Sequence, residues 1–164
     1  MEHPHIEIPK FLSHLPVYVG FPIPFTTFVH EGKPDFRVTD MEKWDACVRS
    51  QLCGICGRKL GEYSYFIGGP ISVENRLFFD PAMHKDCAEY AARICPFLNG
   101  RKTEYRPLTN EPPEGFSVEK REMVSDIRPD KLFILKARTV KVGMTYVQEK
   151  LLIKAPPWSG VREF

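Results

Sequence analysis

The chain has 164 residues, of which 23 are basic and 21 acidic, and its formal net charge is +2. Its hydrophobic fraction of 43% and aromatic fraction of 12% are too high for a disordered chain. The balanced charge excludes a wholesale polycationic nucleic-acid coat protein, and no apolar run approaches the roughly 20 residues of a membrane-spanning helix.

Residues 1–38 are rich in proline, with six prolines among them. Proline restricts its own φ angle and biases the preceding residue toward extended conformations. We therefore expect residues 11–25 to form an extended, apolar arm without a long helix, which wraps the core or contacts a partner. Short strands are expected over 26–30 and 36–38, around a turn at 31–34. The four histidines of this segment lack a helical pair spacing, so we interpret them as structural residues.

A helix is predicted over residues 40–51. Thr39 and Glu42 have the spacing of a capping box, in which Thr39 accepts from a backbone N–H of the first turn and Glu42 reaches back to the cap. Trp44 and Cys47 fall on one face of this helix, which we expect to be buried. Cys47 is therefore interpreted as a core thiol.

Four potential metal ligands occur in two pairs of equal spacing. Cys53 and Cys56 are separated by two residues, and a glycine follows each of them, so a tight turn can aim both thiolates at one point. His84 and Cys87 form the second pair. On a helix, residues three apart are neighbours on one face, so this pair can also aim at one point.

The segment between the two pairs predicts the elements that bring them together. Residues 62–67 and 71–79 are expected to be the strands of a β-hairpin. Asp80 and Pro81 suit the cap and the first turn of a helix, which we expect to begin there. A cysteine knuckle, a hairpin and a helix that supplies the last two ligands follow one another in a treble-clef zinc finger.

The ligand set indicates the kind of metal. Three cysteines and one histidine suit tetrahedral zinc, whereas catalytic zinc usually keeps an open position that four protein ligands do not leave. We therefore predict one structural Zn²⁺ ion, held by Cys53, Cys56, His84 and Cys87. Cys95 lies eight residues beyond Cys87, about 12 Å along a helix axis, so we assign it to packing.

An HNH-type nuclease is a further interpretation, because that fold also builds a hairpin and a helix around a metal. Asn75 can serve as its asparagine. However, no histidine lies between Cys56 and His84 to act as the general base, so the nuclease is the less favoured interpretation.

The Cys-x-x-Cys and His-x-x-Cys motifs, followed by Cys-Pro-Phe-Leu at 95–98, resemble a treble-clef-like zinc-binding family of uncharacterised bacterial and phage proteins. The resemblance extends into the region around residues 128–131. It implies a treble-clef-like zinc site on the four ligands named above. It implies no established activity, because treble clefs serve nucleic-acid binding, protein contacts and scaffolding alike.

The C-terminal third is predicted to be mostly β. Residues 107–115 are expected to form a linker or long loop, and residues 118–127 a short polar helix. Residues 131–142 show the clearest strand pattern in the chain. Gly143 is expected to turn the chain, so that residues 146–154 return as the partner strand.

The predicted fold class is therefore α+β, with an extended N-terminal arm, a central treble-clef-like zinc module and a C-terminal β-hairpin. We divide the chain into three segments, and expect them to pack as one compact unit. Residues 1–38 hold the arm and a short hairpin, residues 39–100 the first helix and the zinc module, and residues 101–164 the linker and a basic β-hairpin.

Charge is uneven along the chain. Residues 131–164 carry seven basic and two acidic side chains, a net of +5, so the first 130 residues carry a net of −3. A basic surface for nucleic acid is predicted from the following residues: Arg58, Lys59, Arg76, Lys85, Lys136, Arg138 and Lys141. The alternative is a solvated outer face, in which lysines protect edge strands from pairing.

These features favour a zinc-binding, nucleic-acid-binding accessory protein, with DNA or RNA as its partner. The alternative is a protein interaction module or inhibitor that uses the apolar arm. No catalytic motif, small-molecule substrate or membrane segment is identified, and whether the chain is an enzyme stays open.

We expect no secretion signal, because no basic segment followed by an apolar one opens the chain. With three of five cysteines assigned to metal and two to the core, a reducing, cytoplasmic setting is expected.

Overall fold

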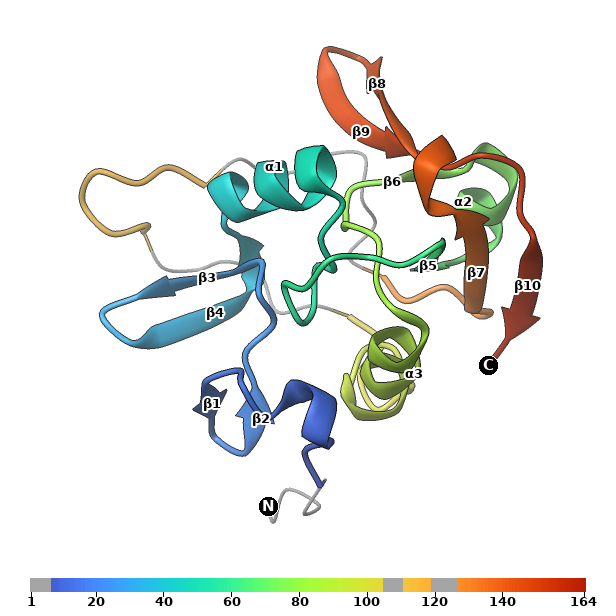
Figure 1. Ribbon diagram of the computed structural model, residues 1–164. Helices are drawn as coiled ribbons and strands as arrows, with labels where there is room; N and C mark the ends of the chain where they lie inside the picture. The colour runs from blue at the N-terminus through green and yellow to red at the C-terminus, as the bar shows by residue number, and fades with distance from the viewer. Residues whose placement is uncertain (1–6, 105–110, 119–126) are drawn as a thin grey trace.

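The computed structural model describes residues 7–104, 111–118 and 127–164 (Figure 1). In these residues three α-helices and several small antiparallel sheets form a mixed α+β structure, which confirms the predicted fold class at this level. The helices are α1 (Met41–Ser50), α2 (Pro70–Asn75) and α3 (Lys85–Ile94), with two single turns of 3₁₀-helix, η1 (Lys10–Leu12) and η2 (Thr139–Lys141).

One sheet has β7 (Phe133–Arg138) at its centre, between β5 (Tyr63–Gly68) and β10 (Gly160–Glu163). Both neighbours are antiparallel to β7. Burial alternates along the end of β7, where Leu135 and Ala137 are fully buried and the basic residues between and after them are not. At this end of β7, one face therefore belongs to the core and the other carries basic side chains, whereas Ile134 nearer its start is buried on that second face.

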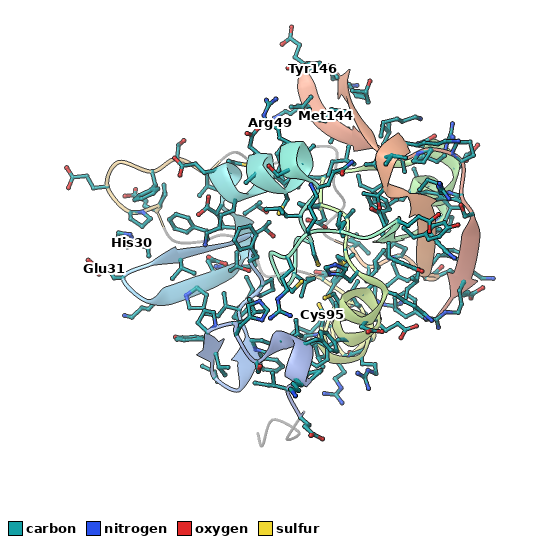
Figure 2. All side chains as sticks on the ribbon, in the orientation of Figure 1. His30, Glu31, Arg49, Cys95, Met144 and Tyr146 are labelled. Carbon is teal, nitrogen blue, oxygen red and sulfur yellow. The ribbon has the colours of Figure 1, made fainter. Side chains whose placement is uncertain are left out.

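A second sheet has the order β6–β9–β8, formed by β6 (Leu77–Phe78), β9 (Lys150–Lys154) and β8 (Gly143–Val147). β8 and β9 are joined by a two-residue turn whose residues both have positive φ angles. Such a turn matches the twist of a hairpin. This hairpin projects from the body of the molecule in Figure 1, and Figure 2 labels two of its side chains, Met144 and Tyr146.

The N-terminal segment folds back on the molecule. After η1 it forms a small hairpin from β1 (Val17–Tyr18) and β2 (Phe21–Pro22), and a second from β3 (Thr27–His30) and β4 (Lys33–Thr39). The second hairpin confirms the strands expected around residues 31–34. Three apolar side chains of the arm, Leu12, Leu15 and Ile23, are buried, so much of the arm is packed on the core.

Two predicted hairpins are wrong. Residues 71–79 do not return as a strand beside residues 62–67, because Pro70 begins α2 and β5 pairs with β7 instead. Proline is well suited to the first turn of a helix, where its missing N–H costs nothing. The short strand that follows, β6, pairs with β9. The hairpin required by the nuclease interpretation is therefore not formed.

The predicted C-terminal hairpin also has different partners. Residues 131–142 do not form one strand, because η2 interrupts them and its buried Thr139 anchors the turn through a bond from the Val142 N–H. β7 lies before this turn and β8 after it, and β9 pairs with β8 rather than with β7. A hairpin is present near the C-terminus, but it is the β8–β9 hairpin.

Both helix starts differ from the prediction. α1 covers the expected residues, but its cap is Asp40, whose carboxylate accepts from the N–H groups of Glu42 and Lys43 at 3.1 and 3.2 Å. Thr39 is instead the last residue of β4. α3 begins at Lys85 rather than at residues 80–81, because Met83 is held in an extended bridge to β5. The polar helix predicted over 118–127 falls almost wholly outside the described residues.

A single buried cluster joins the elements. Its members include Leu12 from η1, Trp44 from α1, Phe66 from β5, Leu135 from β7 and Ile153 from β9. All three segments delimited from the sequence therefore contribute side chains to it. The boundaries between those segments stay predictions.

The cap of α1 gives a test of its assignment. Asp40→Ala removes the acceptor of two N–H groups, so we expect the free energy of unfolding to fall by about 1 kcal/mol. Asp40→Asn keeps an acceptor oxygen and is the matched control, expected to stay within about 0.5 kcal/mol of the parent. Chemical denaturation followed by circular dichroism measures both. An alanine variant as stable as the parent would contradict the assignment.

Candidate metal centre

The loop between α1 and β5 forms a tight knuckle that presents Cys53 and Cys56. The Cys53 N–H donates to the carbonyl of Arg58 at 2.8 Å, and the Gly57 N–H donates to the carbonyl of Cys53 at 2.8 Å. The Cys56 N–H points at the Cys53 sulfur, 3.5 Å away. Gly57 has a φ of +73°, which glycine adopts without strain. The backbone of the knuckle thus turns both thiols to the same side.

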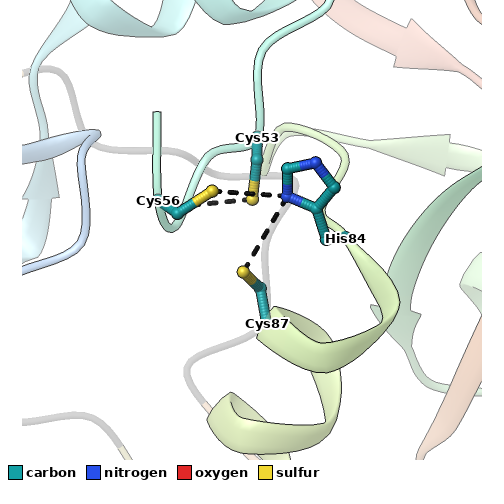
Figure 3. A group of neighbouring side chains, drawn as sticks. All are labelled: Cys53, Cys56, His84 and Cys87. Atoms are coloured by element: carbon teal, nitrogen blue, oxygen red, sulfur yellow. Dashed lines mark hydrogen bonds between the residues drawn. The ribbon is translucent and has the colours of Figure 1, made fainter. Parts of the chain in front are cut away.

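α3 supplies the other two side chains at its beginning. His84 is the cap residue of the helix and Cys87 lies in its first turn. The His84 side chain makes no capping bond, because its imidazole is turned toward the cysteines (Figure 3). The structure therefore brings together all four predicted ligands, although the helix starts later than expected.

The four donor atoms have the spacing of a metal site. They all lie within 4.8 Å of one another. The Nδ1 atom of His84 is 3.3 Å from the Cys56 sulfur and 4.0 Å from the Cys87 sulfur. In tetrahedral zinc, bonds of about 2.3 Å to sulfur and about 2.05 Å to nitrogen put the two donors about 3.5 Å apart. The observed distances bracket that value, so the residues present fit a tetrahedral ion.

The hydrogen bond on the far side of His84 selects the ligating nitrogen. Nε2 lies 2.9 Å from the carbonyl oxygen of Lys59. A carbonyl only accepts, so Nε2 carries the proton and the lone pair of Nδ1 faces the three sulfurs. Histidine ligands of metals commonly use their second ring nitrogen in this way.

The electrostatics of the three thiols favour a cation. Bonds from the thiols of Cys53 and Cys87 hold the pKa of Cys56 far below its usual range. Hydrogen bonding to Cys53 and Cys56, together with burial, raises the pKa of Cys87 far above it. The cluster on its own therefore stabilises one thiolate and opposes the others. A divalent ion among the sulfurs would favour ionisation of all three thiols, because it attracts every thiolate.

The N-terminal arm closes over the knuckle. The N–H of Phe25 donates to the carbonyl of Ile55 at 2.8 Å, and the N–H of Thr26 donates to the carbonyl of Gly54 at 3.3 Å. His14 adds a bond from its Nε2 to the carbonyl of Cys56 at 2.8 Å. Sequence reasoning missed these contacts, because groups as far apart as 42 residues leave no spacing signal. The histidine is structural, as predicted, but it acts on the knuckle itself.

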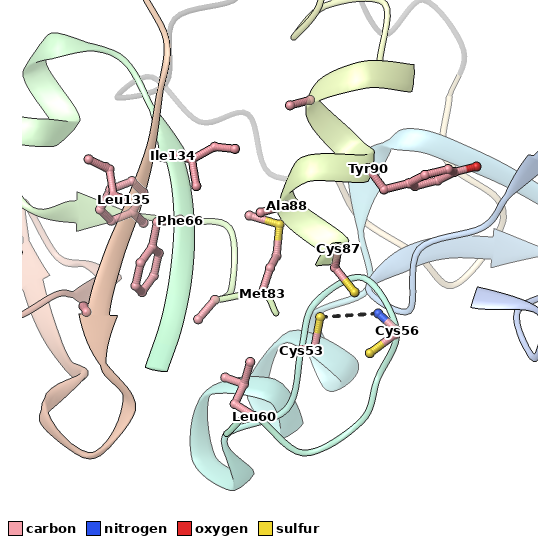
Figure 4. Close-up of a cluster of buried hydrophobic side chains, with 14 of the residues drawn as sticks. Cys53, Cys56, Leu60, Phe66, Met83, Cys87, Ala88, Tyr90, Ile134 and Leu135 are labelled. Carbon is pink, nitrogen blue, oxygen red and sulfur yellow. Dashed lines mark hydrogen bonds between the residues drawn. The ribbon is translucent and has the colours of Figure 1, made fainter. Parts of the chain in front are cut away.

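We call Cys53, Cys56, His84 and Cys87 the metal group. This group lies at the edge of the buried cluster, as Figure 4 shows for Cys53 and Cys87 beside Met83 and Ala88. Cys47 and Cys95 do not belong to the group. Cys47 is buried, and burial raises the pKa of its thiol to about 12, so it is neutral near pH 7. Cys95 is the half-buried cap at the end of α3.

The predicted nucleic-acid residues come from several elements. Arg58 and Lys59 end the knuckle and Lys85 begins α3, and all three are exposed. Arg76 ends α2, and Lys141 lies in η2.

Lys136 and Arg138 are neighbours on one face of β7. The Lys136 Nζ lies 4.0 Å from the centre of the Tyr63 ring, and Arg138 lies 5.5 Å from it. Arg138 also forms an ion pair with Glu62. Of the seven predicted residues, Lys136 and Arg138 therefore flank the Tyr63 ring, and Arg138 is also paired with an acidic side chain.

Comparisons of the chain with protein-family models, with curated proteins and with solved structures find no match. The resemblance to the treble-clef-like family therefore stays a prediction, and the metal group rests on its own geometry. Every helix in the described part of the chain is too short or too polar to cross a membrane.

Gly57 provides a test of the knuckle. A Cβ atom added there would lie 2.8 Å from the Phe25 ring, in a backbone conformation that alanine rarely adopts. We expect Gly57→Ala to lower the free energy of unfolding by roughly 1–3 kcal/mol. Gly61→Ala is the matched control, since nothing lies within 4 Å of its Cβ position, and we expect a change of at most about 0.5 kcal/mol. Equal stability of the two variants in thermal and chemical unfolding would contradict this account.

Proposed function

We propose that Cys53, Cys56, His84 and Cys87 bind one Zn²⁺ ion with a structural role. The observation that carries the proposal is the convergence of four donor atoms within 4.8 Å, with the lone pair of His84 Nδ1 directed at three sulfurs. Thiolate and imidazole donors in a tetrahedral arrangement suit zinc better than magnesium or calcium, which prefer oxygen ligands.

The role is structural because the coordination shell is closed. Four protein ligands fill a tetrahedral ion and leave no position for a substrate or a reactive water. Cys53 and Cys87 have exposed fractions of 0% and 1%, so the ion would also be shielded from solvent. When bound, zinc supplies no chemistry beyond neutralising thiolates and holding the knuckle against α3.

The ion would hold three parts of the chain together. It joins the knuckle to α3 directly, and the knuckle in turn carries the arm through bonds from His14, Phe25 and Thr26. We therefore propose a zinc-stabilised accessory protein, kept in a reducing, cytoplasmic compartment. The five free cysteines support that compartment.

For the partner, nucleic acid is the candidate that we propose to test first. The supporting observation is the face of β7, where Lys136 and Arg138 flank Tyr63 next to β5. Cations beside an aromatic ring can contact phosphates and bases together. Because Glu62 pairs with Arg138, we expect binding to be weak and sensitive to salt.

A protein partner at the arm is the second candidate. The arm buries Leu12, Leu15 and Ile23, so a partner would meet its remaining exposed side chains, chiefly those of the β1–β2 hairpin. In that hairpin, Val17 on β1 and Val19 in the turn are more than half exposed. A partner would therefore contact this hairpin and not the arm as a whole.

Metal content tests the zinc proposal. We expect about one zinc per chain by elemental analysis of the purified protein, and loss of folding when a strong chelator removes it. Acid should release the metal as well, because protons compete for the thiolates and the imidazole.

Two cysteine variants on the same helix make the comparison specific. Cys87→Ser should lose the metal and fold poorly, because it removes a ligand. Cys95→Ser should keep the metal, because it lies outside the group. Equal zinc content in the two variants would contradict the ligand assignment.

Salt-dependent binding tests the nucleic-acid candidate. We expect fluorescent DNA or RNA fragments to bind at low salt, and the slope of log K against log salt to fall by about 1 for each of Lys136→Ala and Arg138→Ala. Arg49→Ala is the control, because Arg49 lies on α1 and is paired with Asp45. A protein that retains neither DNA nor RNA at low salt would exclude this candidate and leave the zinc proposal intact.

A further inference from the structure

β8 forms an edge of the β6–β9–β8 sheet, and no described residue pairs with its outer side. Exposed edge strands usually carry lysine, proline or a bulge, which prevent pairing with other chains. β8 has the sequence Gly-Met-Thr-Tyr-Val, with neither charge nor proline. Met144 is 40% exposed and Tyr146 is 71% exposed (Figure 2). The strand therefore presents an unprotected, partly apolar edge.

The turn of the β8–β9 hairpin shows which backbone groups face outward. Val147 pairs with Lys150 across the two-residue turn, so these two residues exchange hydrogen bonds. Hydrogen-bonded pairs alternate along an antiparallel ladder, which makes Thr145 opposite Leu152 the next such pair. The N–H and C=O groups of Met144 and Tyr146 consequently point away from β9, toward the free edge.

We propose that this edge pairs with β8 of a second copy of the chain, antiparallel and about a twofold axis at Thr145. In this register Met144 lies opposite the partner's Tyr146, and Tyr146 lies opposite the partner's Met144. Each such pair exchanges two backbone hydrogen bonds, so the outward groups of both residues are satisfied. The methionine sulfur also meets an aromatic ring, which is a favourable contact.

The charges at the ends of β8 fit the same register. Lys141, the last residue of η2, and Glu149, in the β8–β9 turn, are both exposed and flank β8 at its two ends. Twofold pairing therefore brings the Lys141 end of one copy to the Glu149 end of the other. β8 itself carries no charge, so no like charges oppose each other inside the paired strands. The edge is self-complementary in backbone, side chains and charge.

The interface is small, because each copy contributes one strand of five residues. Interfaces well below about 1,200 Å² are typical of weak association. We therefore expect a reversible dimer in which the two sheets join into one continuous sheet through their β8 strands. This pairing does not involve the metal group or the basic face of β7.

Sedimentation equilibrium of the full chain, as purified, tests the dimer. We expect mostly monomer at roughly 10 μM and a large dimer fraction at roughly 500 μM. Tyr146→Lys should leave the chain monomeric at both concentrations, since lysine on an edge strand opposes pairing. Ile71→Lys is the matched control, because Ile71 is 75% exposed on α2, and it should dimerise like the parent.

Charge exchange tests the register. Lys141→Glu and Glu149→Lys should each weaken the dimer by roughly 3- to 10-fold, because like charges then meet at both ends of the pair. The double variant should restore the parent's affinity.

Three outcomes would overturn the proposal: a parent protein that is monomeric at every concentration, dimerisation that survives Tyr146→Lys, or no recovery in the double variant. Zinc content and circular dichroism, measured on the same samples, separate the result from the zinc proposal. A metal-free protein that still dimerises would refute the zinc proposal and leave the dimer proposal intact.

Discussion

The convergence of three thiols and one imidazole between the knuckle and α3 is the constraint on which the rest of the structure depends. On their own the three sulfurs do not all ionise, because the hydrogen bonds among them lower the pKa of Cys56 and raise that of Cys87, whereas a bound cation favours every thiolate. In the account proposed here, the ion therefore contributes directly to folding. Its effect reaches beyond the ligands, because the carbonyls of the knuckle accept bonds from the arm.

The ligand group could be predicted from sequence because its information is local. Two pairs of ligands, each with a two-residue spacing, indicate a turn and a helix start, and the structure places all four side chains together. The strand partners could not be predicted in the same way. β5 pairs with β7, about 70 residues further along the chain, and nothing near β5 indicates that partner. The β-rich composition of residues 71–79 favoured a strand, but Pro70 favoured the first turn of a helix there.

The proline-rich N-terminal segment also shows how far composition alone can predict structure. Its composition predicted an extended arm without a long helix, where the structure has a 3₁₀ turn and the short β1–β2 hairpin, and it left open whether the arm would wrap the core or meet a partner. The structure shows that Phe25 and Thr26 bond to the knuckle and that Leu12 is fully buried. Besides the exposed β1–β2 hairpin, the surfaces left for partners are the basic face of β7 and the free edge of β8. The basic residues of β7 could be named from the sequence, but their place beside Tyr63 and the free edge of β8 could not, because each depends on which strand lies beside which.

The most direct test of the central claim is X-ray absorption spectroscopy at the zinc edge of the purified protein. We expect four-coordinate zinc with three sulfur ligands at about 2.3 Å and one nitrogen ligand at about 2.05 Å. A shell of oxygen ligands, a shell of four sulfurs, or a folded protein that holds no zinc would contradict it.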